Sequence, residues 1–264
     1  MTGSAWLLAA PLGFTIALFF APLALMVGRS LTDAAGAPTI AHYARFVADP
    51  YYLTGLLVTL GTAALVTLVT LAGSYPVAYA YWRSGPRTKS VLVVLLLSPF
   101  YANVVVKVFG WMVILPGDLL NSYAGLVLVS IHRATPFMVL LLASAMARIE
   151  PEWIESARMC GARGSRVLRT IVLPLSIPGA AAGGSLVFSL TVAAYVVPAL
   201  VGGRWRGRFL PVQMYQQITI AQDWGFGAAI GVVLLVTSVM TMAAVNRALR
   251  SANVGRIMRD EFTT

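Results

Sequence analysis

Charged side chains are scarce in this sequence. Only 11% of the 264 residues are Asp, Glu, Lys or Arg, whereas soluble domains contain about 25%. Hydrophobic residues make up 59% of the chain, and the mean hydropathy is +0.82. These values exclude an ordinary soluble domain and indicate an integral membrane protein.

Residue types that enzymes and metal centres use are also scarce. The only cysteine, Cys160, cannot form an internal disulfide, and its place between Met159 and Gly161 favours packing over redox or metal chemistry. Neither of the two lysines ends a G-x-x-x-x-G-K-[ST] loop, so the chain has no phosphate-binding loop for ATP. His42 and His132 belong to no metal-ligand spacing and no nucleophile motif. We therefore expect no enzymatic activity, cofactor or metal in this chain.

Long uncharged runs predict six membrane spans. A transmembrane helix needs about 20 mainly apolar residues, and such runs occur at residues 6–28, 51–82, 90–115, 123–147, 171–203 and 224–246. The first run has no Lys or Arg before it and exceeds the apolar core of a secretory signal, so we expect it to remain as a span. The predicted fold class is an all-α polytopic membrane protein with six transmembrane helices.

Lys and Arg are unevenly distributed between the predicted loops. Six spans put both termini on one side of the membrane, and that side carries 12 Lys and Arg against 5 on the other. Lys and Arg favour cytoplasmic loops, so we expect residues 148–170 and both termini to be cytoplasmic. Orientation in the membrane also explains the net charge of +10 better than nucleic-acid binding does.

The charged segment after the fourth span has the pattern of two short helices. Pro151 suits a first helical turn, and acidic residues around it face the positive end of the helix dipole. Gly161 is expected to end this helix with a left-handed cap, and Gly164 with Ser165 to turn the chain and cap a second helix. One interpretation is a solvated loop that only sets topology; the other is a working part.

The spacing within this segment favours the second interpretation. Glu155-Ser156-Ala157 is followed after three residues by Gly161, and after nine more by Ile171-Val172-Leu173-Pro174. This resembles the E-A-A-x3-G-x9-I-x-L-P loop of binding-protein-dependent ABC importer permeases, with Ser156 replacing the first Ala. In that family the loop forms a coupling helix that docks in a groove of a separate ATPase subunit. The residues to which the resemblance assigns this coupling are Glu155, Ser156, Ala157, Gly161, Ala162, Ile171, Leu173 and Pro174.

The resemblance extends over about residues 54–246. Segments that look like the spermidine/putrescine-type branch of these permeases are Ser98-Pro99-Phe100, Thr135-Pro136-Phe137-Met138, and residues 197–203 and 223–229. The resemblance implies three parts: a first helix with an outer loop at 1–53, an importer transmembrane domain at 54–248 with its coupling loop at 150–174, and a cytoplasmic tail at 249–264.

The same resemblance implies the partners and the location. Two ABC ATPase subunits would bind ATP and Mg²⁺ and hydrolyse the nucleotide, and a second permease, identical or homologous, would complete the pathway. A periplasmic solute-binding protein would deliver the solute. The chain would lie among the lipids of a bacterial inner membrane, with no role for nucleic acid.

Two basic residues, Lys107 and Arg133, lie inside predicted spans. They either snorkel or pair structurally, or they line the solute pathway together with His132 and Pro136. A proline removes an intrahelical hydrogen bond, and broken helices in transporters usually line a cavity. The predicted spans contain no Asp or Glu. An anionic or zwitterionic solute therefore fits better than a polycation, unless a partner permease supplies carboxylates.

The last outer loop places three arginines and a tryptophan outside the membrane. Either Trp205 anchors the loop at the lipid headgroups, or the arginines dock a solute-binding protein through Arg–carboxylate pairs. The arginines concerned are Arg204, Arg206 and Arg208. Residues 210–222 are expected to form an amphipathic helix, with Leu210, Met214 and Ile218 on one face.

Together these features predict a permease subunit that passes a small polar solute across the inner membrane. The solute would be a polyamine, or an amino-acid-like or anionic small molecule. The first alternative is a secondary transporter or channel driven by an ion gradient, which the lack of acidic residues in the spans disfavours. The second is a membrane-embedded assembly factor whose loop binds a cytosolic partner.

Overall fold

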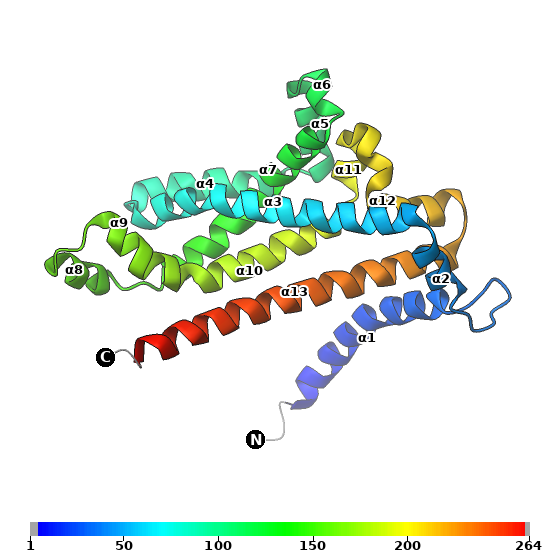
Figure 1. The fold of residues 1–264 in the computed structure, drawn as a ribbon, viewed down its shortest axis with the longest axis horizontal. Coiled ribbons are helices and arrows are strands. Elements are labelled where there is room, and N and C mark those ends of the chain that lie inside the picture. The colour runs from blue at the N-terminus through cyan, green and yellow to red at the C-terminus, as the bar shows by residue number, and fades with distance from the viewer. Residues whose placement is uncertain (1–4, 262–264) are drawn as a thin grey trace. The chain divides into compact units, whose positions relative to one another are not determined.

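The computed structural model describes the backbone of residues 5–261 and the side chains of residue 11, residues 13–245 and residue 247. Within this part the chain is almost entirely α-helical (Figure 1). The longer helices are α1 (Ala5–Ser30), α3 (Pro50–Arg83), α4 (Pro86–Tyr101), α5 (Val104–Ile114), α7 (Tyr123–Met146), α10 (Leu173–Val192) and α13 (Trp224–Glu261). The shorter ones are α2 (Ala41–Ala48), α6 (Gly117–Leu120), α8 (Pro151–Met159), α9 (Gly164–Val167), α11 (Val196–Val201) and α12 (Leu210–Tyr215). An isolated antiparallel bridge joins Thr32 to Pro38.

Five helices of the described chain are long and apolar enough to cross a membrane, and the third predicted span is broken. The run at 90–115 forms two helices, α4 and α5, whose axes bend by 101° at the break. Asn103 is the N-cap of α5, and its side chain accepts a hydrogen bond of 2.8 Å from the backbone N–H of Val105. The six predicted spans are present when α4 and α5 are counted as one span, and this third span is bent and not a single straight helix.

The chain divides into two compact units, and α3 and α13 each contribute residues to both. The first unit comprises residues 1–57 and 207–237. Its core contains Phe46, Tyr52, Leu210, Phe226 and Ile230. The short helix α2 also belongs to this unit. The amphipathic helix predicted at 210–222 is present as α12 followed by a π-helix, Gln216–Ile220.

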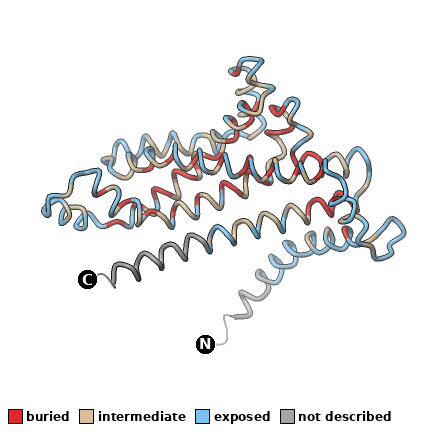
Figure 2. Tube along the Cα trace, viewed as in Figure 1, coloured by how far each residue is buried: buried red, intermediate tan, exposed pale blue. Residues whose placement is uncertain are grey.

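The second unit comprises residues 58–206 and 238–264, and its core lies between α7 and α10. Figure 2 shows buried residues along both helices. Gly179 and Gly183 of α10 allow the close approach: a Cβ atom at Gly179 would lie 2.4 Å from the Cβ of Ala145, and one at Gly183 would lie 2.6 Å from the sulfur of Met138. Small residues at such a contact are typical of membrane helix pairs.

The described part of the C-terminal segment, up to Glu261, belongs to helix α13. Helix α13 continues to Glu261, well past the apolar run that ends near residue 246. Arg247 is exposed. Three further arginines of the predicted tail, Arg250, Arg256 and Arg259, lie outside the described side chains.

Candidate functional site

The segment between α7 and α10 folds into an elbow of two short helices. Gly161 has φ +78°, the left-handed conformation expected for it. Its N–H donates to the carbonyl of Arg158 at 2.9 Å, and the N–H of Ala162 donates to the carbonyl of Ala157 at 3.0 Å. These two bonds form a Schellman motif, which satisfies the last carbonyls of α8 and fixes the turn.

The start of the second short helix differs from the prediction. The N-cap of α9 is Arg163, whose side chain makes no capping hydrogen bond, and Ser165 lies inside the first turn. A π-helix, Leu168–Val172, then joins α9 to α10. The N-cap differs from the prediction because Gly161 already turns the chain, so Gly164 can adopt a helical backbone and begin α9. No serine cap is needed for that reversal.

The residues predicted to couple to an ATPase divide between two faces of the elbow. Those that pack against the core of the second unit are Ala157, Ala162 and Ile171. Those that are exposed are Glu155, Ser156, Gly161 and Leu173, while Pro174 is half-buried. The exposed group is open to a partner, and the partly buried group packs the elbow against the core of the second unit.

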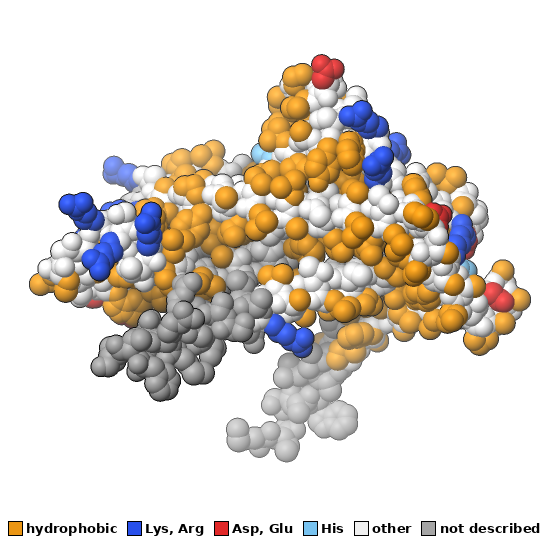
Figure 3. Space-filling model, in the orientation of Figure 1, with side chains coloured by type: hydrophobic (Ala, Val, Ile, Leu, Met, Phe, Trp, Pro, Cys, Tyr) orange, Lys and Arg blue, Asp and Glu red, His pale blue; other side chains and the backbone are white. Residues whose placement is uncertain are grey.

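The exposed face of α8 also carries two large apolar side chains that the sequence analysis did not single out. Trp153 is 44% exposed and Met159 is 89% exposed. The signal was present in the sequence, because Ile154 and Ala157 are three apart and form the partly buried stripe of α8, which leaves Trp153 and Met159 outside it. Lys and Arg side chains gather over the same end of the unit (Figure 3).

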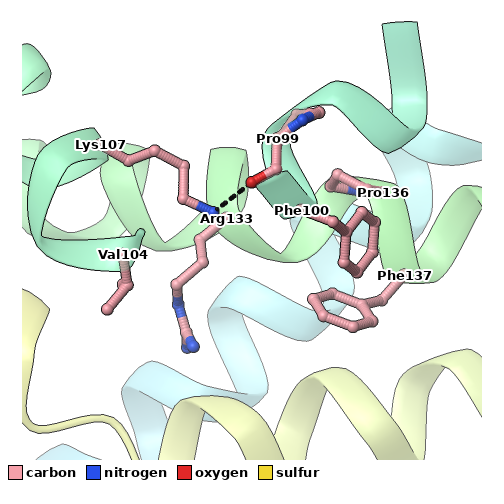
Figure 4. A pocket seen from close by; sticks show the side chains of 7 residues that line it. All are labelled: Pro99, Phe100, Val104, Lys107, Arg133, Pro136 and Phe137. Atoms are coloured by element: carbon pink, nitrogen blue, oxygen red, sulfur yellow. Dashed lines mark hydrogen bonds between the residues drawn. The ribbon is translucent and has the colours of Figure 1, made fainter. Parts of the chain in front are cut away.

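A basic pocket lies beside the break between α4 and α5, against α7 (Figure 4). Its volume is about 190 Å³, and its lining residues are Pro99, Phe100, Val104, Lys107, Arg133, Pro136 and Phe137. The rings of Phe100 and Phe137 meet edge to face at 4.8 Å. None of these lining residues, all of them described, carries a carboxylate.

Lys107 connects the two halves of the broken span. Its Nζ donates a hydrogen bond of 2.9 Å to the backbone carbonyl of Pro99 (Figure 4). Pro99 lies in the last turn of α4, where backbone carbonyls lack partners within the helix. A cation at this end is also favoured by the helix dipole. Lys107 therefore acts as a side-chain cap of α4 donated from α5.

Arg133 is the second cation of the basic pocket. Its Nη2 donates to the carbonyl of Leu190 on α10 at 2.9 Å, and its buried Nε has no hydrogen-bond partner in the described chain. A neighbouring cavity of only about 10 Å³ is lined by both Lys107 and Arg133 and by His132. The His132 ring packs edge to face against Trp111, with centroids 5.3 Å apart.

The four residues predicted to line a pathway, Lys107, His132, Arg133 and Pro136, lie close together. The helix break beside them is not at the proline. Pro136 forms part of the pocket wall, yet α7 runs without interruption from Tyr123 to Met146. The break that opens the pocket is in the preceding span. The two cations lie beside apolar walls within predicted spans, which is an arrangement suited to holding a negatively charged group.

The outer arginine loop is a 3₁₀-helix, Gly203–Arg208. Arg204 is exposed and lines a hollow of about 410 Å³ with Gly117, Asp118, Asn121 and Ser122. Trp205 is half-buried, and its ring packs on that of Tyr123 with centroids 5.1 Å apart, so protein surrounds part of its indole ring. Arg206 and Arg208 are also exposed.

Known proteins share this fold and sequence pattern. A family model described as "Binding-protein-dependent transport system inner membrane component" matches residues 9–252. The spermidine/putrescine transport system permease protein PotB of Escherichia coli (strain K12) is 26% identical over an alignment that covers 91% of this chain and 96% of that one. The putative 2-aminoethylphosphonate transport system permease protein PhnU of Salmonella typhimurium is also 26% identical, over 88% of this chain and 87% of that one.

Solved structures agree in fold. A bacterial ABC transporter involved in the import of the acidic polysaccharide alginate superposes with a TM-score of 0.75 at 15% identity, over 93% of this chain and 96% of that chain. The MetNI methionine ABC transporter, in inward-facing conformations, gives a TM-score of 0.62 at 17% identity, over 75% of this chain and 94% of that chain. The chain therefore belongs to the family of binding-protein-dependent transport system inner membrane components: it is a multi-pass permease component of an ABC importer, and ATP hydrolysis belongs to a separate subunit.

Proposed function

We propose that this permease passes a small polar solute with a negatively charged group, and that the group is held in the basic pocket. The observation that carries the proposal is the pairing of Lys107 and Arg133 in one pocket whose lining residues include no carboxylate. An unpaired cation in a membrane interior is costly. A solute anion would offset that cost for both side chains at once.

The hydrogen bonds that the two cations already make are compatible with such a ligand. Lys107 and Arg133 each donate to a neutral backbone carbonyl, and a charged acceptor forms a hydrogen bond roughly twice as strong. The phenyl rings of Phe100 and Phe137 offer an apolar wall for the rest of a small solute. A carboxylate or a phosphonate therefore suits the pocket, and 2-aminoethylphosphonate, the compound in the name of the relative PhnU, carries a phosphonate.

A polyamine is the second candidate, and the similarity to PotB favours it. A polycation would need carboxylates or aromatic faces along its path. The spans of this chain contain no Asp or Glu, so a partner permease would have to supply the carboxylates. The basic pocket would then repel the cargo, and for this reason the anionic solute is the better-supported choice.

Movement of the solute would be driven through the elbow formed by α8 and α9. In this proposal, two ATPase subunits clasp the elbows of the two permeases. On this chain the contact is the exposed face with Trp153, Glu155, Ser156 and Met159, and the inward face transmits the motion to α7 and α10. An exposed tryptophan and methionine amid charged residues are typical of a contact surface. The solute shifts the equilibrium between inward-facing and outward-facing states only through its different affinity for the two.

The remaining parts of the proposal concern the two membrane surfaces. The elbow and both termini face the cytoplasm, as the excess of Lys and Arg indicates. Arg204, Arg206 and Arg208 face the periplasm and contact acidic side chains of a loaded solute-binding protein. A second permease, identical or homologous, completes the pathway.

Reconstitution tests the proposal and separates it from an ion-driven transporter. Proteoliposomes with the second permease and the ATPase receive solute-binding protein loaded with either 2-aminoethylphosphonate or putrescine. We expect ATP-dependent uptake of the anion-bearing solute only, and loss of that uptake in Lys107→Met. Uptake that follows an ion gradient without nucleotide, or putrescine uptake that persists in Lys107→Met, contradicts the proposal.

The native cysteine tests the orientation of the elbow. Cys160 is exposed at the end of α8 and is the only cysteine of the chain. A membrane-impermeant maleimide should label it in inverted vesicles and fail to label it in intact spheroplasts. Bound ATPase should protect it. Labelling from the periplasmic side refutes the cytoplasmic assignment.

A further inference from the structure

The first unit contains a recess that the importer function leaves unexplained. Its volume is about 480 Å³, larger than the basic pocket. The walls come from the end of α1, the turn that follows it, the start of α2 and the loop that leads into α13. The residues that line it are Arg29, Thr32, Asp33, Ala34, His42, Ala221, Gln222, Asp223, Trp224 and Gly225.

The recess lies at the depth of the lipid headgroups. The apolar stretch of α1 ends at Ser30, and that of α13 begins at Trp224. Arg29 and Trp224 both line the recess, so it is formed where two spans leave the hydrocarbon on the same side. Trp224 is 62% exposed. An exposed tryptophan at a span end is typical of the interface.

Two charges of the recess are available to a ligand. The guanidinium of Arg29 forms no hydrogen bond or ion pair with any other described residue, and only its backbone carbonyl accepts, from Thr32. Asp33 uses Oδ1 to accept from the backbone N–H groups of Ala35 and Ala37, at 2.9 and 2.8 Å, which leaves Oδ2 open within the described chain. Asp223 is already neutralised by Arg45 at 2.9 Å. The recess therefore offers one free cation and one free carboxylate oxygen.

The walls that carry these charges are fixed before any ligand arrives. The turn after α1 is closed by the Thr32–Pro38 bridge and by Gly36 at φ +85°. His42 contacts the same turn through a 3.1 Å hydrogen bond between its Nε2 and the carbonyl of Thr32. A preorganised site loses less entropy on binding than a flexible one. The spacing of the two charges is thus set by the fold.

An apolar track continues from Arg29 toward the membrane interior. Leu25 and Leu18 lie one and three turns before it on the same face of α1, and they are 71% and 60% exposed. A ligand with a negative group, a positive group and an aliphatic tail matches this order of surfaces. Asp33 would repel a purely anionic headgroup, and Arg29 would repel a dication.

We infer that this recess binds the phosphoethanolamine headgroup of a zwitterionic phospholipid. Arg29 and the indole N–H of Trp224 hold the phosphate, Asp33 Oδ2 accepts from the ammonium group, and an acyl chain follows Leu25 along α1. The inference is independent of which solute is imported. It adds a lipid ligand on the outer leaflet if the elbow faces the cytoplasm.

The test uses the purified importer complex in detergent, with short-chain phosphatidylethanolamine, short-chain phosphatidylglycerol and free phosphoethanolamine as probes. Native mass spectrometry and thermal stability report binding. We expect phosphatidylethanolamine to bind best, and Asp33→Asn or Arg29→Gln to weaken its binding by roughly tenfold, because each removes one charge-assisted hydrogen bond. Arg29→Lys keeps the charge and should retain binding if the fold is intact. Arg87→Gln, an exposed arginine at another span end, is the matched control.

Three results overturn the inference. The first is equal binding of phosphatidylethanolamine and phosphatidylglycerol by the unchanged protein. The second is equal binding of free phosphoethanolamine, which assigns the site to a soluble zwitterion instead of a lipid. The third is a loss of ATPase stimulation by the solute-binding protein in Asp33→Asn with unchanged lipid binding, which assigns the recess to protein docking.

Discussion

Replacement of Gly161 by alanine should loosen the elbow by a predictable amount. The added methyl group meets no atom within 4 Å, so the only cost is the left-handed backbone at φ +78°. An L-residue pays about 1–2 kcal/mol for that conformation. This corresponds to a factor of about 5–30 in the equilibrium between the capped and the opened turn.

Gly164→Ala is the matched control for this prediction. Gly164 lies three residues further along the same exposed elbow, and a methyl group there also meets no atom within 4 Å. Its backbone is helical, so alanine is neutral or slightly stabilising at this position. The two variants therefore differ in backbone conformation alone.

Amide hydrogen exchange measures the effect directly. The N–H of Ala162 is held by the carbonyl of Ala157 at 3.0 Å, and this bond exists only while the turn is closed. We expect its exchange to become about 5–30 times faster in Gly161→Ala and to change little in Gly164→Ala. ATPase activity in the complex should become less dependent on loaded solute-binding protein in the first variant only. Identical exchange in both variants refutes the role given to Gly161.

Four further outcomes follow from the structure. Lys107→Met should abolish uptake while leaving ATPase binding intact, and normal uptake in reconstituted vesicles counts against the basic pocket. Glu155→Lys should leave the protein inserted but weaken co-purification of the ATPase, and unchanged co-purification excludes Glu155 from that contact. Gly179→Ala should lower the melting temperature, since overpacking costs about 1–3 kcal/mol, whereas Gly184→Ala, whose methyl group meets only Thr67 at 3.6 Å, should not. Arg204→Glu should raise the dissociation constant of the solute-binding protein, most at low salt.

Local chemistry allowed much of the elbow to be predicted. A glycine is the residue that most easily adopts a left-handed cap, and this fixed the end of α8 at Gly161 before any tertiary contact was known. The Ser165 cap was predicted by the same reasoning and is wrong, because a capping side chain is one of several ways to begin a helix. Only the tertiary structure showed which face of α8 is exposed, because Ile154 and Ala157 pack against the core.

The broken third span shows where sequence patterns stop being informative. The apolarity of residues 90–115 indicates that the segment prefers lipid, but it carries almost no information about the 101° bend within the segment. Pro136 was the expected break, yet a proline in a long helix is tolerated where neighbouring helices support the backbone. The actual break is stabilised by a side chain of the next helix, Lys107, bonded to Pro99.

The sequence by itself determined that this chain is a six-span membrane protein with a charged elbow, because burial in lipid and the left-handed glycine are properties of short segments. Its resemblance to a known loop then indicated an importer. Only the tertiary structure decided that Lys107 and Arg133 share one pocket, and that the exposed charges of Arg29 and Asp33 face a common recess. Lys107 and Arg133 come from α5 and α7, and their meeting depends on how the helices pack. No local pattern encodes that distance.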